Sequence, residues 1–408
     1  MKKFTLNSYV IVLLILFVIF LPTAITQDAE SELDAIVTAV GLDSVGEEVE
    51  VSLQVIVPTP SAQFSQQLSV ISTKAQTVGE GMSNLSLRLG KKIAFPHCKV
   101  VVFNNALAEK GLAEPLDFFV RNKANGDNMV LLGIDDSAKE MLNSISDIDN
   151  SLYFGLSNSG SYNKQYTKGK QLDLGNFYKK YLSEDSSLII GSVSLESAKD
   201  VGMMVIPNSS GASQGGEASG GNSSGEGQKT VVNKGESMLL KSGKKIKDLT
   251  SNETMAFNWF DVDANRGFIT IEGVTDSLYQ DASVGIDIDK KKTKVKTYFD
   301  GDTPVYKLKL DLYVRVVEIK ENSKNATKYK EDKAFLTPKL KEMLKEKIAQ
   351  NIDEAVNIAK ENNTDIMLAA KTINKFDHSK FEKYKENNKD NILKNIRFEK
   401  EINIKEKL

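Results

Sequence analysis

Cysteine and histidine are nearly absent from this chain, which holds one cysteine and two histidines among 408 residues. A single cysteine excludes an internal disulfide framework and any multi-cysteine metal site. With only His97 and His378, a histidine-based zinc site is close to excluded as well. The thiol of Cys98 stands in an apolar run from Phe95 to Phe103, so we expect it to pack as a small hydrophobic side chain.

Catalytic motifs are also lacking. The chain has no G-x-S-x-G, no Walker loop and no H-E-x-x-H. His97 is flanked by Phe95, Pro96, Cys98 and Val100, which form no acid–base set, so we interpret it as a structural histidine that is hydrogen-bonded at the start of a strand. We therefore predict that the protein is not an enzyme, with no catalytic, cofactor-binding or metal-binding residues and no cofactor.

One segment resembles a calcium loop. Asp261, Asp263, Asn265 and Glu272 occupy its first, third, fifth and twelfth positions, where oxygen ligands are needed. The glycine is displaced by one position to Gly267, and a strand-like sequence follows it. A hairpin turn rich in Asp and Asn explains the same residues, and we favour it. Just before this segment, we interpret Trp259 as a core residue rather than a ligand-stacking one.

The N-terminus has the features of an export signal. Met1-Lys2-Lys3 precedes an uncharged apolar run from Tyr9 to Leu21. This run is shorter than the roughly 20 residues of a free-standing membrane span, and its cleavage site is poor. Residues 1–27 are therefore predicted to be a signal peptide or a signal anchor, with both alternatives open. We expect the rest of the chain on the outer face of the cytoplasmic membrane.

Charge is distributed unevenly along the chain. Residues 1–228 carry 17 basic and 25 acidic side chains, a net −8, whereas residues 229–408 carry 36 and 30, a net +6. In the second half, however, the lysines alternate with carboxylates, as from Lys339 to Lys347. That pattern is typical of a solvated helix face. We predict no nucleic-acid partner.

Elements of both kinds interleave in the first half, whereas strands dominate the second. The predicted fold class is α+β, with two to three mixed α/β domains whose central sheets are flanked by helices, and a C-terminal half made of an antiparallel sheet with one long helix. The Gly/Ser-rich stretch is expected to be a linker or a disordered loop. The predicted divisions are an N-terminal α/β domain at 28–206, the Gly/Ser-rich stretch at 207–229, a middle region at 230–275 and a C-terminal α+β domain at 276–408.

Periodicity places the individual elements. In the first half we expect strands at 33–42, 49–57, 99–103, 129–134, 187–193 and 201–206, and helices at 75–89, 105–110, 115–120, 137–145 and 175–182. In the second half we expect strands at 267–274, 282–289, 292–298, 306–316 and 396–404. The long helix begins at Thr337-Pro338, a capping hydroxyl followed by proline, and ends near Asn363.

An ordered set of segments resembles the Ger(x)C family, the C subunits of germinant receptors in spore-forming Firmicutes. The segments are Glu32–Asp43, Val51–Pro60, Thr77–Ser86, Lys92–His97, Leu107–Leu112, Leu116–Arg121, Lys247–Trp259 with its L-x-x-x-E-T pattern, the terminal helix, Asp365, and the last strand. They cover nearly the whole chain beyond the N-terminal apolar run. One departure is clear: family members usually carry a lipobox cysteine before the first strand, and Leu21–Asp28 has none.

This resemblance implies a non-catalytic subunit, tethered at the membrane, in a nutrient germinant receptor. Its implied partners are integral membrane subunits of the A and B types, which bind small nutrients such as amino acids or sugars. No small molecule is expected to bind this chain directly. The alternative is an extracytoplasmic solute-binding protein, which would have two similar lobes around a cleft. An exported enzyme is a more distant alternative.

Overall fold

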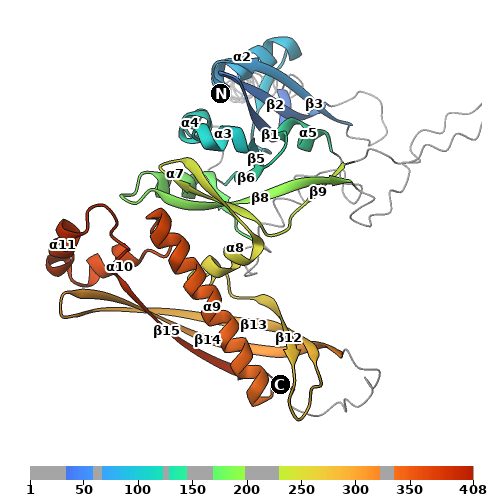
Figure 1. Cartoon of the computed structure of the whole chain (residues 1–408). Coiled ribbons are helices and arrows are strands. Elements are labelled where there is room, and N and C mark those ends of the chain that lie inside the picture. Colours follow the sequence, from blue (N-terminus) through green and yellow to red (C-terminus); the bar gives the residue numbers. More distant parts are fainter. Residues whose placement is uncertain are drawn as a thin grey trace, which may run out of the picture.

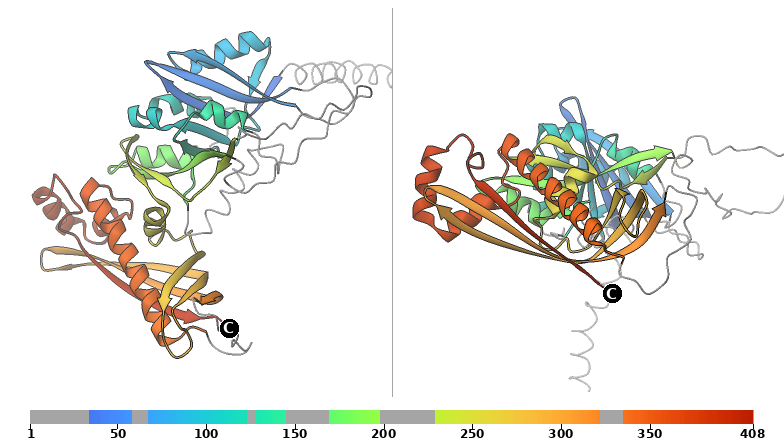
Figure 2. Two further views of the ribbon diagram at one scale, coloured as in Figure 1. Left: turned by 45° about the vertical axis from the view of Figure 1, so that its right-hand side comes forward. Right: turned by 60° about the horizontal axis from the view of Figure 1, so that its bottom comes forward.

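A computed structural model gives the arrangement of the chain, and it describes residues 34–57, 67–122, 128–144, 169–197, 229–321 and 335–407. Figure 1 shows two parts, each built on its own sheet, with a short helix, α8, lying between them. Figure 2 shows the same division from two further directions. The predicted signal segment 1–27, the strand expected at 201–206 and the Gly/Ser-rich stretch lie outside the described residues.

The first part is a mixed sheet. Among the described residues it has eleven strands, with the main path β11-β10-β8-β6-β5-β1-β2-β3. β1, β5, β6 and β8 are parallel, and antiparallel strands extend both edges. The strands are β1 Asp34–Val45, β2 Glu48–Val57, β3 Gln67–Ala75, β4 Lys92–Ala94, β5 Val100–Asn104, β6 Val130–Ile134, β7 Leu172–Asp173, β8 Ser187–Ser197, β9 Lys229–Val232, β10 Ser237–Lys241 and β11 Lys244–Leu249.

Helices cover both faces of this sheet because its central strands are apolar on both faces. Val101 and Phe103 of β5 belong to one buried cluster, with α2, α3, α4 and α7. Val100 and Val102 point to the other face and pack with α5. The helices are α2 Val78–Leu89, α3 Asn105–Lys110, α4 Ala113–Arg121, α5 Ala138–Asn143 and α7 Leu174–Tyr181.

The second part is a four-stranded sheet with the order β12-β13-β14-β15. β12, β13 and β14 are antiparallel neighbours, and β15 is added parallel to β14. Its strands are β12 Gly267–Val274, β13 Ala282–Asp300, β14 Thr303–Glu321 and β15 Arg397–Glu406. Its helices are α8 Ser251–Asn258, α9 Pro338–Asn362, α10 Ala369–Phe376 and α11 His378–Asn387.

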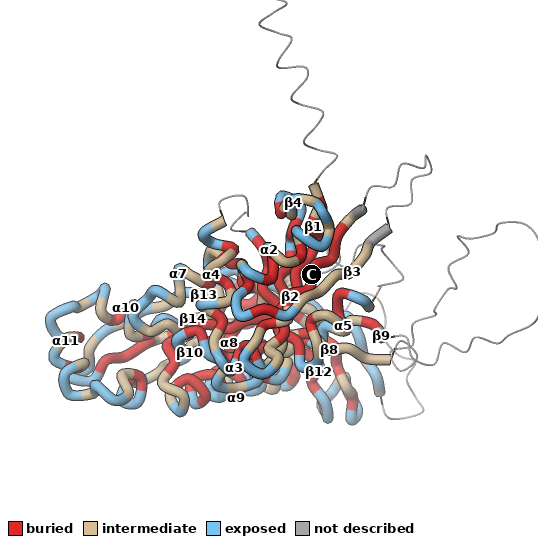
Figure 3. Tube along the Cα trace, turned by 90° about the horizontal axis from the view of Figure 1, so that it is seen from above, coloured by how far each residue is buried: buried red, intermediate tan, exposed pale blue. Residues whose placement is uncertain are grey.

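The long helix α9 crosses one face of the second sheet (Figures 1 and 2). The Thr337 side chain accepts a hydrogen bond from the amide of Leu340, and Pro338 occupies the first turn, as the sequence predicted. The apolar stripe from Leu340 through Leu344 to Ala359 is fully buried. Figure 3 shows the burial pattern, with exposed residues on the outer turns of α9 and α11. Packing against the sheet therefore holds this helix in place.

The two parts share apolar packing. Ile189, Leu239 and Leu249 of the first sheet belong to the same buried cluster as α8, α9 and the second sheet. β10 and β11, which follow the Gly/Ser-rich stretch, pair with each other, and β10 pairs with β8. Residues 229–249 thus complete the first sheet, while 251–274 contribute α8 and β12 at and beyond the junction. The domain boundaries remain a prediction.

The fold class predicted from the sequence is confirmed, but some element boundaries differ. Ala75 ends β3, which periodicity missed, and does not begin a helix. The strands expected at 282–289 and 292–298 are one strand, β13, with a register shift between Ile288 and Lys290. α10 and α11 accompany the long helix. In the described part of the chain, no helix has both the length and the apolar character that crossing a membrane requires.

Candidate functional site

The two parts meet around α8, whose start is fixed by a capping box. The Thr250 side chain accepts a hydrogen bond from the Glu253 amide at 3.2 Å, and the Glu253 carboxylate accepts one from the Thr250 amide at 2.8 Å. The buried hydroxyls of Thr254 and Ser237 lie 2.6 Å apart. Glu253 therefore helps to start α8. The next residue, Thr254, attaches α8 to the first sheet, because Ser237 belongs to β10.

Lys291 of β13 binds the carbonyl groups at the C-terminal end of α8. Only 4% of this residue is exposed, and its Nζ donates hydrogen bonds to the carbonyls of Asn258 at 2.6 Å, Trp259 at 3.2 Å and Asp261 at 2.6 Å. Burial lowers the pKa of Lys291 to about 7, against the opposing effect of the Asp261 carboxylate. Sequence reasoning missed this residue because a run of three lysines, 290–292, is typical of a solvated surface.

The segment that resembles a calcium loop serves the junction instead. The Asp261 carboxylate forms an ion pair with Lys170 of the first part, and the Asn258 side chain donates to the Gly169 carbonyl at 2.7 Å. Burial alone would raise the pKa of Asp261, but the Lys170 ammonium, the Asp263 amide and the Lys291 ammonium together outweigh it and hold that pKa below its ordinary value. Residues 261–266 connect α8 to β12, so the predicted hairpin is wrong. Nowhere in the described ranges do three His, Cys, Asp or Glu side chains group so as to hold a metal ion.

Two further sequence candidates lie away from the junction, in the turn between β4 and β5. His97 is exposed there, shortly before β5, and its interpretation as a structural histidine that is hydrogen-bonded at the start of a strand stays a prediction. Cys98 is buried in the first core, as predicted, and burial raises the pKa of its thiol to about 12. Trp259 is fully buried in the second core, as predicted.

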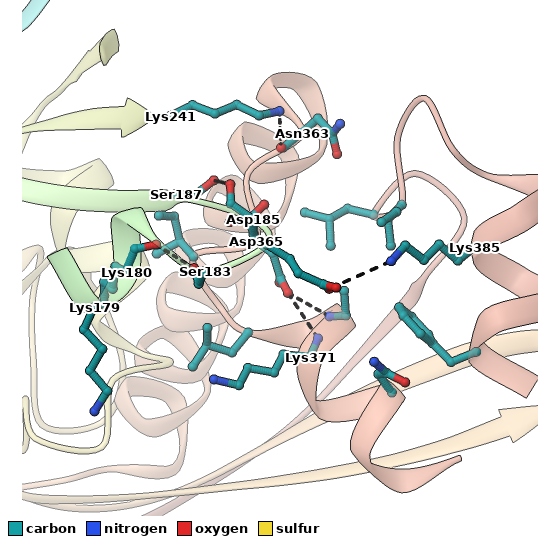
Figure 4. A pocket seen from close by; sticks show the side chains of 18 of the residues that line it. Lys179, Lys180, Ser183, Asp185, Ser187, Lys241, Asn363, Asp365, Lys371 and Lys385 are labelled. Atoms are coloured by element: carbon teal, nitrogen blue, oxygen red, sulfur yellow. Dashed lines mark hydrogen bonds and ion pairs between the residues drawn. The ribbon is translucent and has the colours of Figure 1, made fainter. Parts of the chain in front are cut away.

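A cavity of about 870 Å³ opens on another side of the junction. Its walls come from α7 and the segment that leads to β8, from Lys241 of β10, and from Asn363 to Leu393 in the second part. Figure 4 shows side chains from both parts pointing toward one space. Residues that are nearly 200 positions apart in the chain therefore line one cavity.

The wall of this cavity is rich in lysine. The lining includes six lysines, Lys179, Lys180, Lys241, Lys371, Lys385 and Lys389. It includes three carboxylates, Glu184, Asp185 and Asp365. Lys385 lies 3.8 Å from Glu184, and Lys241 Nζ donates to the Asn363 carbonyl at 2.8 Å. The other four lysines form no ion pair with a carboxylate among the residues whose positions are described. Burial, and then the nearby Lys170 ammonium, lower the pKa of Lys180.

Asp365 forms the turn beside these lysines. Its carboxylate accepts hydrogen bonds from the amides of Ala369 at 2.6 Å and Ala370 at 2.9 Å, at the start of α10. Its own amide donates to the Asp185 carboxylate at 3.0 Å, which links the two parts. Burial raises the pKa of Asp365 to about 7, and Asp185 adds to the rise. Leu368, three residues after Asp365, adopts a left-handed backbone conformation, with φ of 56°.

Two family models match the chain, and the second of them includes β10 and β11, which complete the first sheet. Residues 28–195 match the family described as "Spore germination protein N-terminal domain", and residues 235–406 match "Spore germination B3/ GerAC like, C-terminal". Together the two matches span most of the chain. The chain belongs to the Ger(x)C family. The resemblance found in the sequence is thereby confirmed, and a role in spore germination follows from the family.

A solved structure shows the same fold. The chain of the "Crystal Structure of the GerBC protein" is 15% identical to this Ger(x)C protein, with a TM-score of 0.52. The match covers 90% of this chain and 96% of that one. At this identity the likeness establishes the fold alone. Comparison with curated protein sequences gives no match.

Proposed function

We propose that this Ger(x)C protein is a non-catalytic, membrane-associated subunit of a nutrient germinant receptor, acting on the outer face of the cytoplasmic membrane. The observation that carries this proposal is the pair of germination-family matches over residues 28–195 and 235–406. In a sporulating host, the corresponding site is the spore inner membrane. The proposed partners are integral membrane subunits of the A and B types, and nutrient recognition resides in them.

The buried charged groups support a non-catalytic role, because each stabilises a helix end. The Asp43 carboxylate accepts hydrogen bonds from the amides of Ala138 at 2.7 Å and Lys139 at 2.9 Å, at the start of α5. Asp365 does the same for α10, and Lys291 caps the carbonyls at the end of α8. The contacts of these groups with main-chain atoms are those expected of residues that stabilise the fold.

Attachment by a lipidated cysteine does not apply to this chain. Cys98 is the sole cysteine, and it is buried in the first core far along the chain from the N-terminus. We propose that the apolar run from Tyr9 to Leu21 is kept as an anchor, or that the partner subunits hold the protein at the membrane. The alternative of a solute-binding protein is less well supported, because its two lobes would be alike and the two sheets here differ in strand order.

A deletion in the sporulating host tests the proposal. Spores that lack this gene should fail to germinate with one set of nutrients and still respond to others. The gene restored in trans should recover the response, and deletion of its companion membrane subunits should give the same defect. Unchanged germination with every nutrient tested would refute the receptor role.

A tagged version of the chain provides the complementary measurement. Purified from spore membranes, it should retain multi-span companion proteins. The matched control is Leu344→Asp, which places a charge in the second core and should lose the companions together with the fold. Turnover of a substrate by the purified protein, lost on changing one acidic residue, would instead indicate an enzyme.

A further inference from the structure

We propose that the cavity between the two parts binds a small organic anion, a carboxylate or phosphate group carried on an apolar body. The proposed receptor role requires no such ligand, so this inference goes beyond it. The ligand would contact both parts of the protein at once. Its anionic group would meet the lysines, and its apolar body would lie against the apolar side chains that the second part contributes, from Ile366 to Leu393.

The charge of the wall selects an anion. Lysines from α7, β10, α10 and α11 line the cavity, so they come from elements that are distant in the chain. Lys180 is half-buried, and the carboxylate that raises its pKa against the effect of burial, Asp261, lies outside the cavity wall and is already paired with Lys170. A cation that is partly removed from water is costly unless an anion lies beside it. A ligand carboxylate or phosphate would supply that anion.

Apolar side chains of the second part select an apolar body. Ile366, Leu368, Phe381 and Leu393 line the cavity, and Leu368 is 49% exposed although it is a large apolar side chain. Its left-handed backbone is unfavourable for a residue with a Cβ. Strain of this kind persists at binding sites, where it holds a side chain in a required position. Here it holds an apolar side chain at the edge of a cationic cavity.

The size and position of the cavity fit a small molecule. A volume of about 870 Å³ lies within the range of ligand sites, roughly 300–1,000 Å³. The two parts already meet there through the Asp365 amide and the Asp185 carboxylate. A ligand bound to lysines of α7 and α10 would add a second link between the parts. Binding should therefore stabilise their relative orientation.

Two matched probes test the proposal, 4-fluorobenzoate and its neutral analogue 4-fluorobenzamide. The full-length protein in mild detergent is titrated into each probe, and binding is followed by ¹⁹F NMR. The benzoate should bind at least about ten-fold more tightly than the benzamide, because only the benzoate meets the lysines. Inorganic phosphate, which has the charge without the apolar body, should compete weakly.

Variants then locate the site. Lys180→Met combined with Lys371→Met should weaken benzoate binding by roughly five-fold or more, the effect of losing a partly buried charge contact. The matched control changes Lys341 and Lys345 to Met on the exposed face of α9, in the same detergent, and should leave binding unchanged. Lys371→Gln alone, at an exposed position, tests the same contact if the double variant fails to fold, as judged by Trp259 fluorescence.

Three results would overturn the proposal: equal binding of the two probes, benzoate binding that survives the lysine changes in a folded protein, or no benzoate binding. Leu368→Ser should weaken the benzoate and leave phosphate competition unchanged, and the opposite pattern would refute the apolar contact. Germination assays do not enter these measurements. Failure of the cavity proposal is therefore distinguishable from failure of the receptor role.

Discussion

Asp365→Asn should make the stability of the protein much less dependent on pH. Asn has nearly the shape of a protonated Asp, and its side-chain oxygen still accepts a hydrogen bond from the start of α10. In the wild type, the pKa of Asp365 in the folded protein is about 7, above its ordinary value of 3.8. The folded state therefore binds a proton that the unfolded state releases as the pH rises between these two values.

The sign and the size follow from this difference. The contribution of Asp365 to stability is fully present below about pH 3.8 and is lost as the pH rises toward about 7. One pKa unit corresponds to about 1.4 kcal/mol, so the loss amounts to about 4 kcal/mol. Between about pH 4 and pH 8, the wild type should lose about 4 kcal/mol relative to Asp365→Asn.

Urea unfolding of the chain from Asp28 measures this difference, with the sole tryptophan, Trp259, as the fluorescent reporter in the second core. Other groups that titrate in this range, Lys291 among them, are present in both proteins and cancel. If the free energies of unfolding of the two proteins differ by a constant amount between about pH 4 and pH 8, the assignment of a protonated Asp365 is refuted. The constant difference then measures a simple capping effect of the side chain.

Three further predictions concern the core, a buried lysine and attachment. Leu344→Asp should cost more than about 4 kcal/mol in urea unfolding, since it removes a fully buried side chain and leaves an unpaired charge, whereas Lys341→Glu on the exposed face should change stability by less than about 0.5 kcal/mol. Lys291→Met should cost about 2–3 kcal/mol of stability because three carbonyls lose a donor. The wild type should gain stability as the pH rises from about 7 toward 10.5, because the unfolded state then binds a proton that the folded state has released, and Lys291→Met should abolish this gain. Metabolic lipid labelling should leave the protein unmodified, and label that persists in Cys98→Ala would contradict our reading of the N-terminus.

The sequence was most informative where local signals in the chain set the bounds of a helix. The helix Asn105–Lys110 was predicted to the residue because Gly111 ends it, and the α9 stripe follows from apolar spacing and Thr337-Pro338. α10 and α11 were missed because they are short and have few buried residues, such as Ile373 and Phe381. Their stability comes from packing against the second sheet, which local periodicity does not encode.

The candidate site was largely beyond sequence reasoning. Asp365 was noted only through the family resemblance, and the residue that it contacts across the junction, Asp185, lies 180 positions earlier. Lys291 resembles any surface lysine until the register shift in β13 is known. The Glu253-Thr254 pair was visible as part of a family pattern. Its meaning, a capping box attached to β10 through Ser237, required the fold.

The strand order of the first sheet also sets the timing of its folding during synthesis. β8 lies between β6 and β10, but β10 is made only after the intervening residues 198–236. Until Ser237–Lys241 has emerged, the edge of β8 that β10 will cover has no partner there, and Met238 and Leu240 are missing from the first core. An unpaired strand edge is a template for aggregation. A nascent chain that ends near residue 206 is therefore the vulnerable species, and folding of the first part cannot be completed before Leu249 is available.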